Sequence, residues 1–288
     1  MNGSSMKIHF YDVEHGSCCH IITPNGYHML VDVGSKTNSS IVDHIYDKYF
    51  GIYGSMLSRT IDVLFITHPH EDHIYDLPNL YRTLKPKVLI RPSGAFNIIP
   101  TVFTPTHVNI ATCANAMNAE YPHNAHATGM PLVATIDGVS FAIIVPKAQW
   151  TTKSDLNTFS SIIVVQAFGY KFVLTGDNPK SILQIMMLED YCGIRKQVAN
   201  ATVLLAPHHG RTGEFCKEFF ECVNPILTVV SDKSIEHNTQ TDTAKLYKGR
   251  GANLYNEYRY VLTTRNDGTI TFDVSHGQCL VSMGQEDY

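Results

Sequence analysis

Hydrophobic and polar residues follow two alternating patterns along the chain. Short apolar runs bounded by turn residues predict strands, and apolar residues three or four positions apart predict amphipathic helices. In the first half, these patterns predict strands at Lys7–Tyr11, His20–Thr23, Tyr27–Val33 and Asp62–Thr67, and helices at Ser40–Phe50 and Ile74–Leu84. In the second half, they predict strands at Pro131–Ile136, Val139–Val145, Ser160–Phe168, Lys171–Thr175, Thr202–Leu205, Ile226–Ser231, Arg259–Thr263 and Thr269–Val274, and helices at Lys180–Tyr191, Glu214–Cys222 and Thr241–Lys248. This repetition predicts an α/β protein built from two stacked αβ halves.

The segment from Arg91 to Met130 has the weakest pattern and contains many Pro and Asn residues. A long stretch of this kind inside a compact domain usually forms a functional loop or a lid. We expect it to border the active cleft. Its histidines His107, His123 and His126 are each expected to be polar surface residues.

Composition favours one globular domain over residues 1–288, with residues 1–5 a tag remnant or a short tail. The hydrophobic content of 44% and the charged content of 17% are ordinary for such a protein. No apolar run approaches the roughly 20 residues of a membrane span, and the N-terminus lacks the features of a signal peptide. Seven cysteines without a C-x-x-C pair argue against a disulfide framework and against a thiolate zinc site. We therefore expect a cytoplasmic protein.

A cluster of histidines directly follows the apolar run that ends at Ile66. His68 and His70 share one face of the extended chain, whereas Asp72 and His73 can turn toward a second point nearby. Imidazole and carboxylate groups suit zinc or manganese, and two such ions roughly 3.5–4 Å apart activate water. The motif H-x-H-x-D-H therefore predicts a site for two divalent metal ions in a hydrolase, not a chance cluster among the 15 histidines.

This motif resembles the signature of the metallo-β-lactamase fold, in which an Asp and a His follow much further along the chain. Phe172–Asp177 resembles the family's strand that ends in Gly-Asp, and Val203–Gly210 resembles its last histidine motif. Within the family, Ile8–Gly16 and Met29–Gly34 are similar to the start of the hydrolase domain of the DNA-uptake protein ComEC. The resemblance extends from about Met6 to Val274, and it implies an αββα sandwich of two mixed sheets flanked by helices.

The resemblance also implies the ligands of the two ions. Asp177 is expected to bridge them, with His68 and His70 on the first ion and Asp72 and His73 beside the second. The pair His208-His209 supplies one further ligand. We assign His208 to the metal and His209 to an outer role toward a phosphate oxygen, and the reverse assignment stays open.

One histidine of the broad family is missing, because the corresponding region Ser154–Ser161 contains none. The amide oxygen of Asn157, or water, would then complete the shell of the first ion. Such a site should bind more weakly and tolerate manganese. Asn157 is equally well explained as a residue that caps a turn.

Three acidic residues and one histidine have expected roles near the ions. Asp72 would orient the attacking hydroxide, and Asp12 and Asp32 would orient ligating histidines. His237 would protonate the leaving oxygen or hold the phosphate, or it is a surface residue.

These residues favour a binuclear phosphodiesterase that uses a hydroxide held between the metals. The ComEC resemblance implies a nuclease acting on DNA, with single-stranded DNA as a candidate substrate. The formal net charge of −4 instead favours a small phosphodiester such as a cyclic nucleotide or a phosphocholine ester. A non-catalytic metal-binding partner protein is the alternative from a different class.

Overall fold

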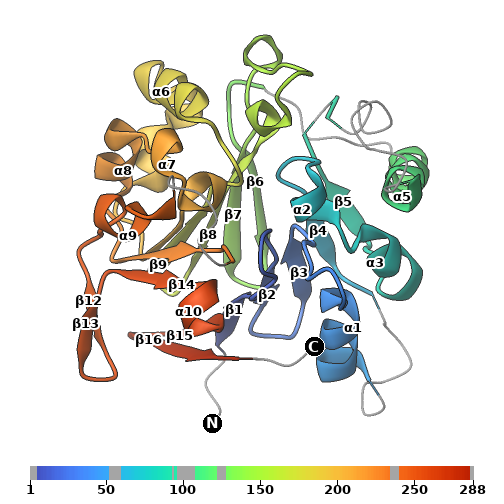
Figure 1. Ribbon diagram of the computed structural model, residues 1–288, viewed down its shortest axis with the longest axis horizontal. Helices are drawn as coiled ribbons and strands as arrows, with labels where there is room; N and C mark the ends of the chain where they lie inside the picture. Colours follow the sequence, from blue (N-terminus) through green and yellow to red (C-terminus); the bar gives the residue numbers. More distant parts are fainter. Residues whose placement is uncertain are drawn as a thin grey trace.

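The computed structural model describes residues 5–51, 60–92, 94–95, 108–121, 128–233 and 240–285. Most of the described chain forms two seven-stranded sheets that lie face to face, with helices on both outer faces (Figure 1). This is the expected αββα sandwich. None of the helices in these ranges is long and apolar enough to cross a membrane.

The first sheet combines the N-terminal strands with the C-terminal hairpin. Its order is β16 (Gln278–Gly284), β15 (Thr269–Ser275), β1 (Met6–Phe10), β2 (Cys19–Ile22), β3 (His28–Val31), β4 (Val63–Phe65) and β5 (Val88–Ile90). The strands from β16 to β3 pair antiparallel, and β3, β4 and β5 run parallel.

The second sheet contains the middle of the chain. Its order is β14 (Val261–Thr263), β11 (Leu227–Val230), β10 (Val203–Leu205), β9 (Tyr170–Leu174), β8 (Ile162–Ala167), β7 (Val139–Ile144) and β6 (Leu132–Ile136). Strands β6 to β9 pair antiparallel, whereas β9, β10, β11 and β14 run parallel. A separate hairpin pairs β12 (Ala252–Leu254) with β13 (Glu257–Arg259).

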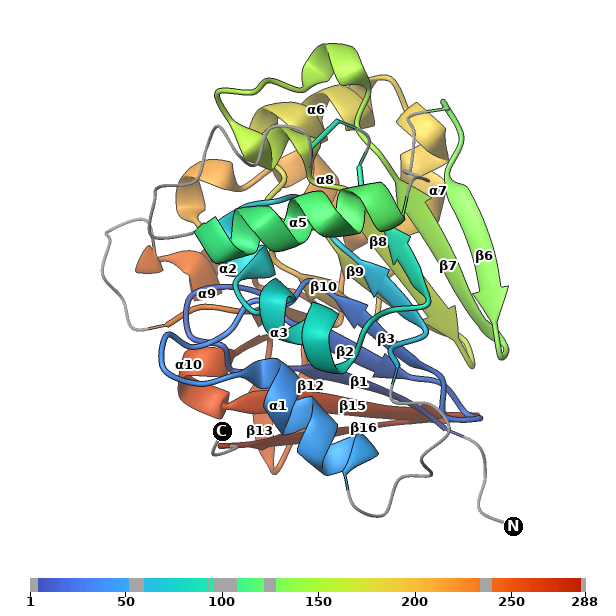
Figure 2. The same ribbon diagram turned by 90° about the vertical axis from the view of Figure 1, so that its right-hand side faces the viewer.

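Helices cover each outer face of the sandwich, as Figures 1 and 2 show from two sides. The first sheet is covered by α1 (Ile41–Ile45), the π-helical turn η1 (Tyr46–Phe50), α3 (Leu77–Thr83) and α5 (Val108–Glu120). The second sheet is covered by α6 (Lys180–Leu188), α7 (Ile194–Val198) and α8 (Lys217–Val223). The remaining short elements are α2 (Glu71–Ile74), α9 (Thr243–Leu246), α10 (Thr264–Asp267) and the 3-10 turns η4 (Ala148–Trp150), η5 (Leu156–Phe159), η6 (Tyr191–Gly193), η7 (Pro207–Gly210) and η8 (Thr212–Glu214).

The alternation of side chains along each strand builds the core. In β1, Met6, Ile8 and Phe10 point between the two sheets and are almost completely buried. Phe10 and Phe172 both pack edge-on against Phe272 at the centre of the sandwich. Burial of each such side chain contributes about 1.5–3 kcal/mol, so the contact between the sheets is a large part of the stability.

Two expectations about the irregular parts of the chain are corrected. The segment Arg91–Met130 contains the 13-residue helix α5, which packs against α3 and is not a loop. Its sequence is rich in Ala and Asn, so its apolar face is narrow and the helical period is weak. Strand β16 was not expected, although Cys279, Val281 and Met283 alternate toward the core. His107, His123 and His126 lie outside the described residues.

Strand direction places the expected site at one edge of the sandwich. Because β3 and β4 run parallel, their carboxyl ends lie together, and the same holds for β9, β10 and β11. The histidine motif follows β4, Asp177 follows β9, and His208-His209 follow β10. The loops that carry these residues therefore converge.

Candidate metal centre

Four side chains from three strand-end loops form a compact group. One ligand atom from each of Asp72, His73, Asp177 and His209 lies within 4.8 Å of the others. Three of these residues are buried and Asp72 is half-buried. The group therefore brings together residues of the histidine motif and of both later motifs, Phe172–Asp177 and Val203–Gly210.

The local backbone explains how the last histidine motif presents its side chains. His208 has φ 48° and His209 has φ 53°, so two consecutive residues other than glycine adopt the left-handed conformation. Such backbone costs energy and is concentrated at functional sites. The turn directs His209 inward, where it is 4% exposed, and leaves His208 half-buried.

The geometry of the group fits a metal cation. Nε2 of His73 lies 3.1 Å from Oδ1 of Asp177, and Nε2 of His209 lies 3.4 Å from Oδ2 of the same carboxylate. Nε2 of His209 is also 3.1 Å from Oδ2 of Asp72. His73 Nε2 is buried without a hydrogen-bond partner among the described residues. A cavity of about 10 Å³ lies between His73, Asp177 and His209, which is the room for one ion or water.

Hydrogen bonds on the opposite side of each ring hold the two histidines. Nδ1 of His73 lies 2.7 Å from Oδ2 of Asp32, and Nδ1 of His209 lies 2.8 Å from the main-chain oxygen of Ser231. Asp32 also accepts hydrogen bonds from the main-chain N–H and the hydroxyl of Thr67, each at 2.8 Å. When Nδ1 donates to these oxygens, Nε2 of each ring is left to face the cavity.

The structure supports the expected role of Asp12 less than that of Asp32. Its carboxylate accepts a hydrogen bond from the main chain of Glu14 at 3.3 Å and lies 4.0 Å from Nζ of Lys36. No contact to a site histidine is described for it. Asp32, in contrast, contacts a histidine of the group directly.

The charged side chains of the site favour the binding of a cation. Burial would raise the pKa of Asp177, but the imidazoles of His209 and His73 hold it well below its usual range. Burial would lower the pKa of His209, but Asp177 and Asp72 raise it to about 10. The two carboxylates thus stabilise positive charge between them, which a divalent cation would supply.

The other half of the histidine motif lies next to this group. Nε2 of His68 is 3.1 Å from Nδ1 of His70, and the His68 ring centroid is 4.2 Å from that of His73. Burial and then the neighbouring His73 lower the pKa of His68 well below its usual value. His68 is therefore a neutral imidazole, which is the form that binds metals.

His208 lies somewhat further from the Asp177 carboxylate than His209 does. Its Nε2 lies 3.9 Å from Oδ2 of Asp177, and its Nδ1 is buried without a hydrogen-bond partner in the described parts of the chain. Of the two adjacent histidines, the structure brings His209 into the four-residue group and leaves His208 beside it.

One predicted site residue, Asn157, has no contact with the group among the described residues. The main-chain N–H of Asn157 donates to Asp155 Oδ1 at 3.1 Å, and Asp155 is the N-cap of η5. The side-chain oxygen of Asn157 is buried and has no hydrogen-bond partner within the described ranges. His237 lies outside the described residues.

Sequence reasoning missed a histidine–carboxylate pair at the mouth of the site. Nε2 of His15 lies 3.5 Å from Oδ2 of Asp72, and its Nδ1 lies 3.4 Å from Oδ1 of Asp232. Its ring centroid is 4.6 Å from that of His209. His15 is 34% exposed whereas Asp232 is buried and also accepts a hydrogen bond from Gln240. The sequence did contain a signal for Asp232, because this acidic residue comes shortly after the buried run of β11.

Two glycines allow the loops to close around Asp72. A Cβ atom at Gly16 or at Gly34 would collide with the main-chain oxygen of Asp72. The main-chain N–H of Ser17 donates to that same oxygen at 3.2 Å. Gly34 therefore allows its loop to approach the main chain of Asp72 closely, and this contact fixes the backbone that carries Asp72.

The model of one protein family matches residues 14–178, which is more than half of the chain, and that family is described as the metallo-beta-lactamase superfamily. The chain belongs to this superfamily. Superfamily members are mainly metal-dependent hydrolases, often with two divalent ions, so the described group is the place where this chain would hold its metal.

Solved structures of low sequence identity share the fold. The metallo-beta-lactamase fold protein YhfI from Bacillus subtilis matches with a TM-score of 0.51 at 12% identity, over 94% of this chain and 100% of that chain. CmlA from Streptomyces venezuelae, a diiron beta-hydroxylase, matches with a TM-score of 0.50 at 11% identity, over 85% of this chain and 50% of that chain. No curated protein matches the chain. Since the superfamily consists mainly of hydrolases and CmlA is a hydroxylase, the fold alone does not fix the reaction.

Proposed function

We propose that this protein is a binuclear metal-dependent phosphodiesterase, and specifically a nuclease that acts on DNA as the ComEC resemblance implies. The observation that supports this most is the four-residue group of Asp72, His73, Asp177 and His209, of which His73, Asp177 and His209 line a cavity of about 10 Å³ with room for one ion. Two zinc or manganese ions, held by this group and by the adjacent His68 and His70, would supply an activated water and neutralise charge on phosphoryl oxygens.

The ligands divide between two positions on either side of Asp177. Asp72, His73 and His209 would hold one ion, and His68 and His70 the other, with Asp177 shared. We assign His208 to the ion of His68 and His70, where the broad family has the histidine that this chain lacks. Two features of His208 support a ligand role: its Nδ1 is buried without a hydrogen-bond partner in the described residues, and its Nε2 lies 3.9 Å from Oδ2 of Asp177. Asn157 would complete the same shell through its unpartnered oxygen.

The residues around the ions would position substrate and water. Asp72 is held by His209 at 3.1 Å, and its carboxylate would accept a hydrogen bond from the attacking water. His15 would donate a hydrogen bond to an oxygen of the phosphodiester, because its ring lies at the exposed edge of the site and Asp232 orients that ring. The role proposed for His237 at the leaving oxygen stays a prediction.

Surface charge favours a short nucleic acid over a long duplex. The basic residues that follow the metal motif are already paired: Lys85 with Glu120 at 2.7 Å and Lys87 with Asp62 at 2.8 Å. Arg91 is buried and donates to Asn118 at 2.7 Å. These pairings and the net charge of −4 predict a gentle salt dependence, with a slope reflecting roughly two to four phosphate contacts.

The surface charge also supports a second candidate function, the hydrolysis of a small phosphodiester such as a cyclic nucleotide. A small substrate needs no extended basic surface and would contact only the ions and the residues beside them. A phosphocholine ester belongs to the same class of small substrate.

Hydrolysis assays separate these candidates. The protein, loaded with manganese or with zinc, is incubated with bis(p-nitrophenyl) phosphate, single-stranded DNA, duplex DNA, RNA and cyclic nucleotides. Asp177→Ala should abolish hydrolysis of every substrate, and the exposed Asp47→Ala serves as the matched control. Cleavage of cyclic nucleotides but of no polynucleotide would replace the nuclease by the second candidate. A fully metal-loaded protein that hydrolyses nothing would support a metal-binding partner protein.

A further inference from the structure

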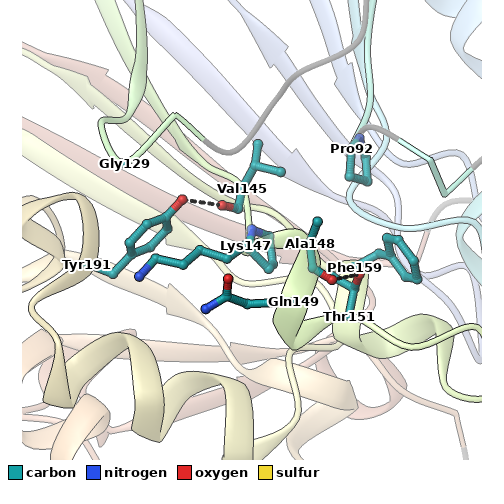
Figure 3. A pocket seen from close by; sticks show the side chains of 10 residues that line it. Pro92, Gly129, Val145, Lys147, Ala148, Gln149, Thr151, Phe159 and Tyr191 are labelled. Carbon is teal, nitrogen blue, oxygen red and sulfur yellow. Dashed lines mark hydrogen bonds between the residues drawn. The ribbon is translucent and has the colours of Figure 1, made fainter.

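A second, larger cavity lies at the same edge of the sandwich as the metal centre. It has a volume of about 410 Å³, within the range of roughly 300–1,000 Å³ that small-molecule sites occupy. Its lining includes Pro92, Val145, Lys147, Gln149, Phe159 and Tyr191 (Figure 3). Pro92 and Gly129, near the ends of the segment expected to border the active cleft, both contribute to it.

The cavity and the metal centre share one stretch of backbone. Phe159 lines the cavity, and the next residue, Ser160, accepts a hydrogen bond through Oγ from the main-chain N–H of Asp177 at 3.2 Å. The N–H of Ser161 then donates to the main-chain oxygen of Thr67 at 3.0 Å, directly before His68. A molecule bound in the cavity would therefore lie beside the loops that carry the metal ligands.

One wall of the cavity is fixed by a compact set of contacts. The hydroxyl of Tyr191 donates to the main-chain oxygen of Val145 at 3.2 Å, as the dashed line in Figure 3 marks. Nζ of Lys147 lies 5.1 Å from the Tyr191 ring centroid and 4.6 Å from that of Trp150. It also pairs with Glu189 at 2.5 Å. The wall is thus ordered before any ligand arrives, which reduces the entropic cost of binding.

The lining combines flat apolar groups with a few hydrogen-bonding groups. Phe159 and Pro92 offer surfaces on which a planar ring can pack, and the exposed amide of Gln149 can both donate and accept at the edge of such a ring. An ammonium has three donors, so Lys147 keeps donors for a sugar hydroxyl or a phosphate oxygen beside its pairing with Glu189. A nucleoside presents this combination of a planar ring, a polar edge and a hydroxylated sugar.

We propose that this cavity binds the nucleoside portion of the substrate, next to the phosphate that the metal centre holds. The proposal rests on the proposed phosphodiesterase function for its place in the reaction, but binding in the cavity is measurable without hydrolysis. It extends the function by making a nucleotide, and not a phosphocholine ester, the preferred phosphodiester.

The chain contains its own reporter for this cavity. Trp150 is the single tryptophan, and its ring centroid lies 5.0 Å from that of Tyr191. Ligand binding against Tyr191 and Lys147 should therefore change the intrinsic fluorescence. Wild-type protein would be titrated with adenosine monophosphate, cytidine monophosphate, adenosine, phosphocholine and inorganic phosphate, and equilibrium dialysis with radiolabelled adenosine monophosphate would provide a second measurement that does not depend on fluorescence.

We expect saturable binding of both mononucleotides and of adenosine, and none of phosphocholine or inorganic phosphate. Gln149→Ala should weaken nucleotide binding about three- to tenfold, the effect of one lost hydrogen bond, whereas the exposed Gln278→Ala should not change it. Asp177→Ala should bind adenosine with wild-type affinity.

Two outcomes would overturn the proposal. The first is the lack of saturable nucleoside and nucleotide binding in dialysis. The second is that Gln149→Ala and wild type bind nucleotide equally well and that wild type binds inorganic phosphate as tightly as nucleotide. Binding without any hydrolysis would instead leave the cavity as a nucleoside site and reject the proposed phosphodiesterase. Hydrolysis of bis(p-nitrophenyl) phosphate without nucleoside binding would reject the cavity alone.

Discussion

Nδ1 of His73 lies 2.7 Å from Oδ2 of Asp32, and both side chains are about 1% exposed. Because Asp32 is fixed by two hydrogen bonds from Thr67, it holds the His73 ring with Nε2 toward Asp177. A carboxylate behind a ligating histidine sets its orientation and increases its basicity. The pair therefore connects the end of β3 to the proposed metal position.

Asp32→Asn should weaken metal binding about 10- to 100-fold, the effect typical of losing such a partner. The amide keeps the shape of the side chain but presents a poorer acceptor to His73. Competition with a zinc chelator measures the affinity, and Asp273→Asn is the matched control, because the Asp273 carboxylate pairs with Nζ of Lys7 at 3.7 Å. Equal metal affinity in wild type and Asp32→Asn would show that this pair has only a structural role.

His208 and His209 should affect different ions. His209→Ala should remove the ion held with Asp72 and His73, and His208→Ala should weaken the ion held with His68 and His70. Elemental analysis of the double variants tests the assignment. His70→Ala with His208→Ala should still retain about one ion per chain, whereas His70→Ala with His209→Ala should retain almost none. The opposite pattern would exchange the two assignments.

His15→Ala should lower kcat/KM without loss of metal. The proposed hydrogen bond from His15 to a phosphodiester oxygen involves a charged acceptor, and such bonds contribute about 1.5–3 kcal/mol, or roughly 10- to 100-fold. Asp232→Asn should cause a smaller loss, since the His15 ring remains but is less firmly oriented. The exposed His276→Ala is the control. A His15→Ala variant that loses metal would make His15 a ligand and not a substrate contact.

The strands and the metal motif could be predicted because both depend on local patterns. The run that ends at Ile66 and the motif that follows it are continuous in sequence, so their joint position at the end of β4 required no tertiary information. The choice between His208 and His209 could not be made from sequence. It depends on two left-handed residues in succession, which are stabilised by tertiary contacts and have no local signal.

His15 and Asp232 were not recognised as a pair because they are 217 residues apart and neither belongs to the motifs that predicted metal ligands. Each follows a strand of a different sheet, and only the stacking of the sheets brings them together. The helix α5 was not predicted for a local reason, since Ala and Asn weaken its hydrophobic face. The metal-binding role of Asn157 remains a prediction: its side-chain oxygen accepts no hydrogen bond within the described residues, and the turn is capped by Asp155.

The last prediction concerns a second group of histidines, on the outer face of β1 to β3. Nε2 of His20 lies 2.9 Å from Nδ1 of His28, and its own Nδ1 lies 3.3 Å from the hydroxyl of Tyr11. His20 is fully buried, and burial, followed by the neighbouring His28 and His9, lowers its pKa well below 6.5. His20 is therefore neutral in the folded protein at pH values where it is protonated in the unfolded chain.

This difference makes the fold sensitive to acid. Below about pH 6.5 the unfolded state binds one more proton at His20 than the native state does, so the free energy of unfolding falls as the pH falls. Above that pH both states are neutral there and the effect is absent. His20 alone should contribute a slope of up to about 1.4 kcal/mol per pH unit between pH 6.5 and its lowered native pKa. Urea unfolding of metal-free protein at pH 7, 6 and 5 measures this. His20→Gln should have a smaller slope, whereas His276→Gln should keep that of wild type, and equal slopes in all three proteins would show that His20 is protonated in the native state or contacts water.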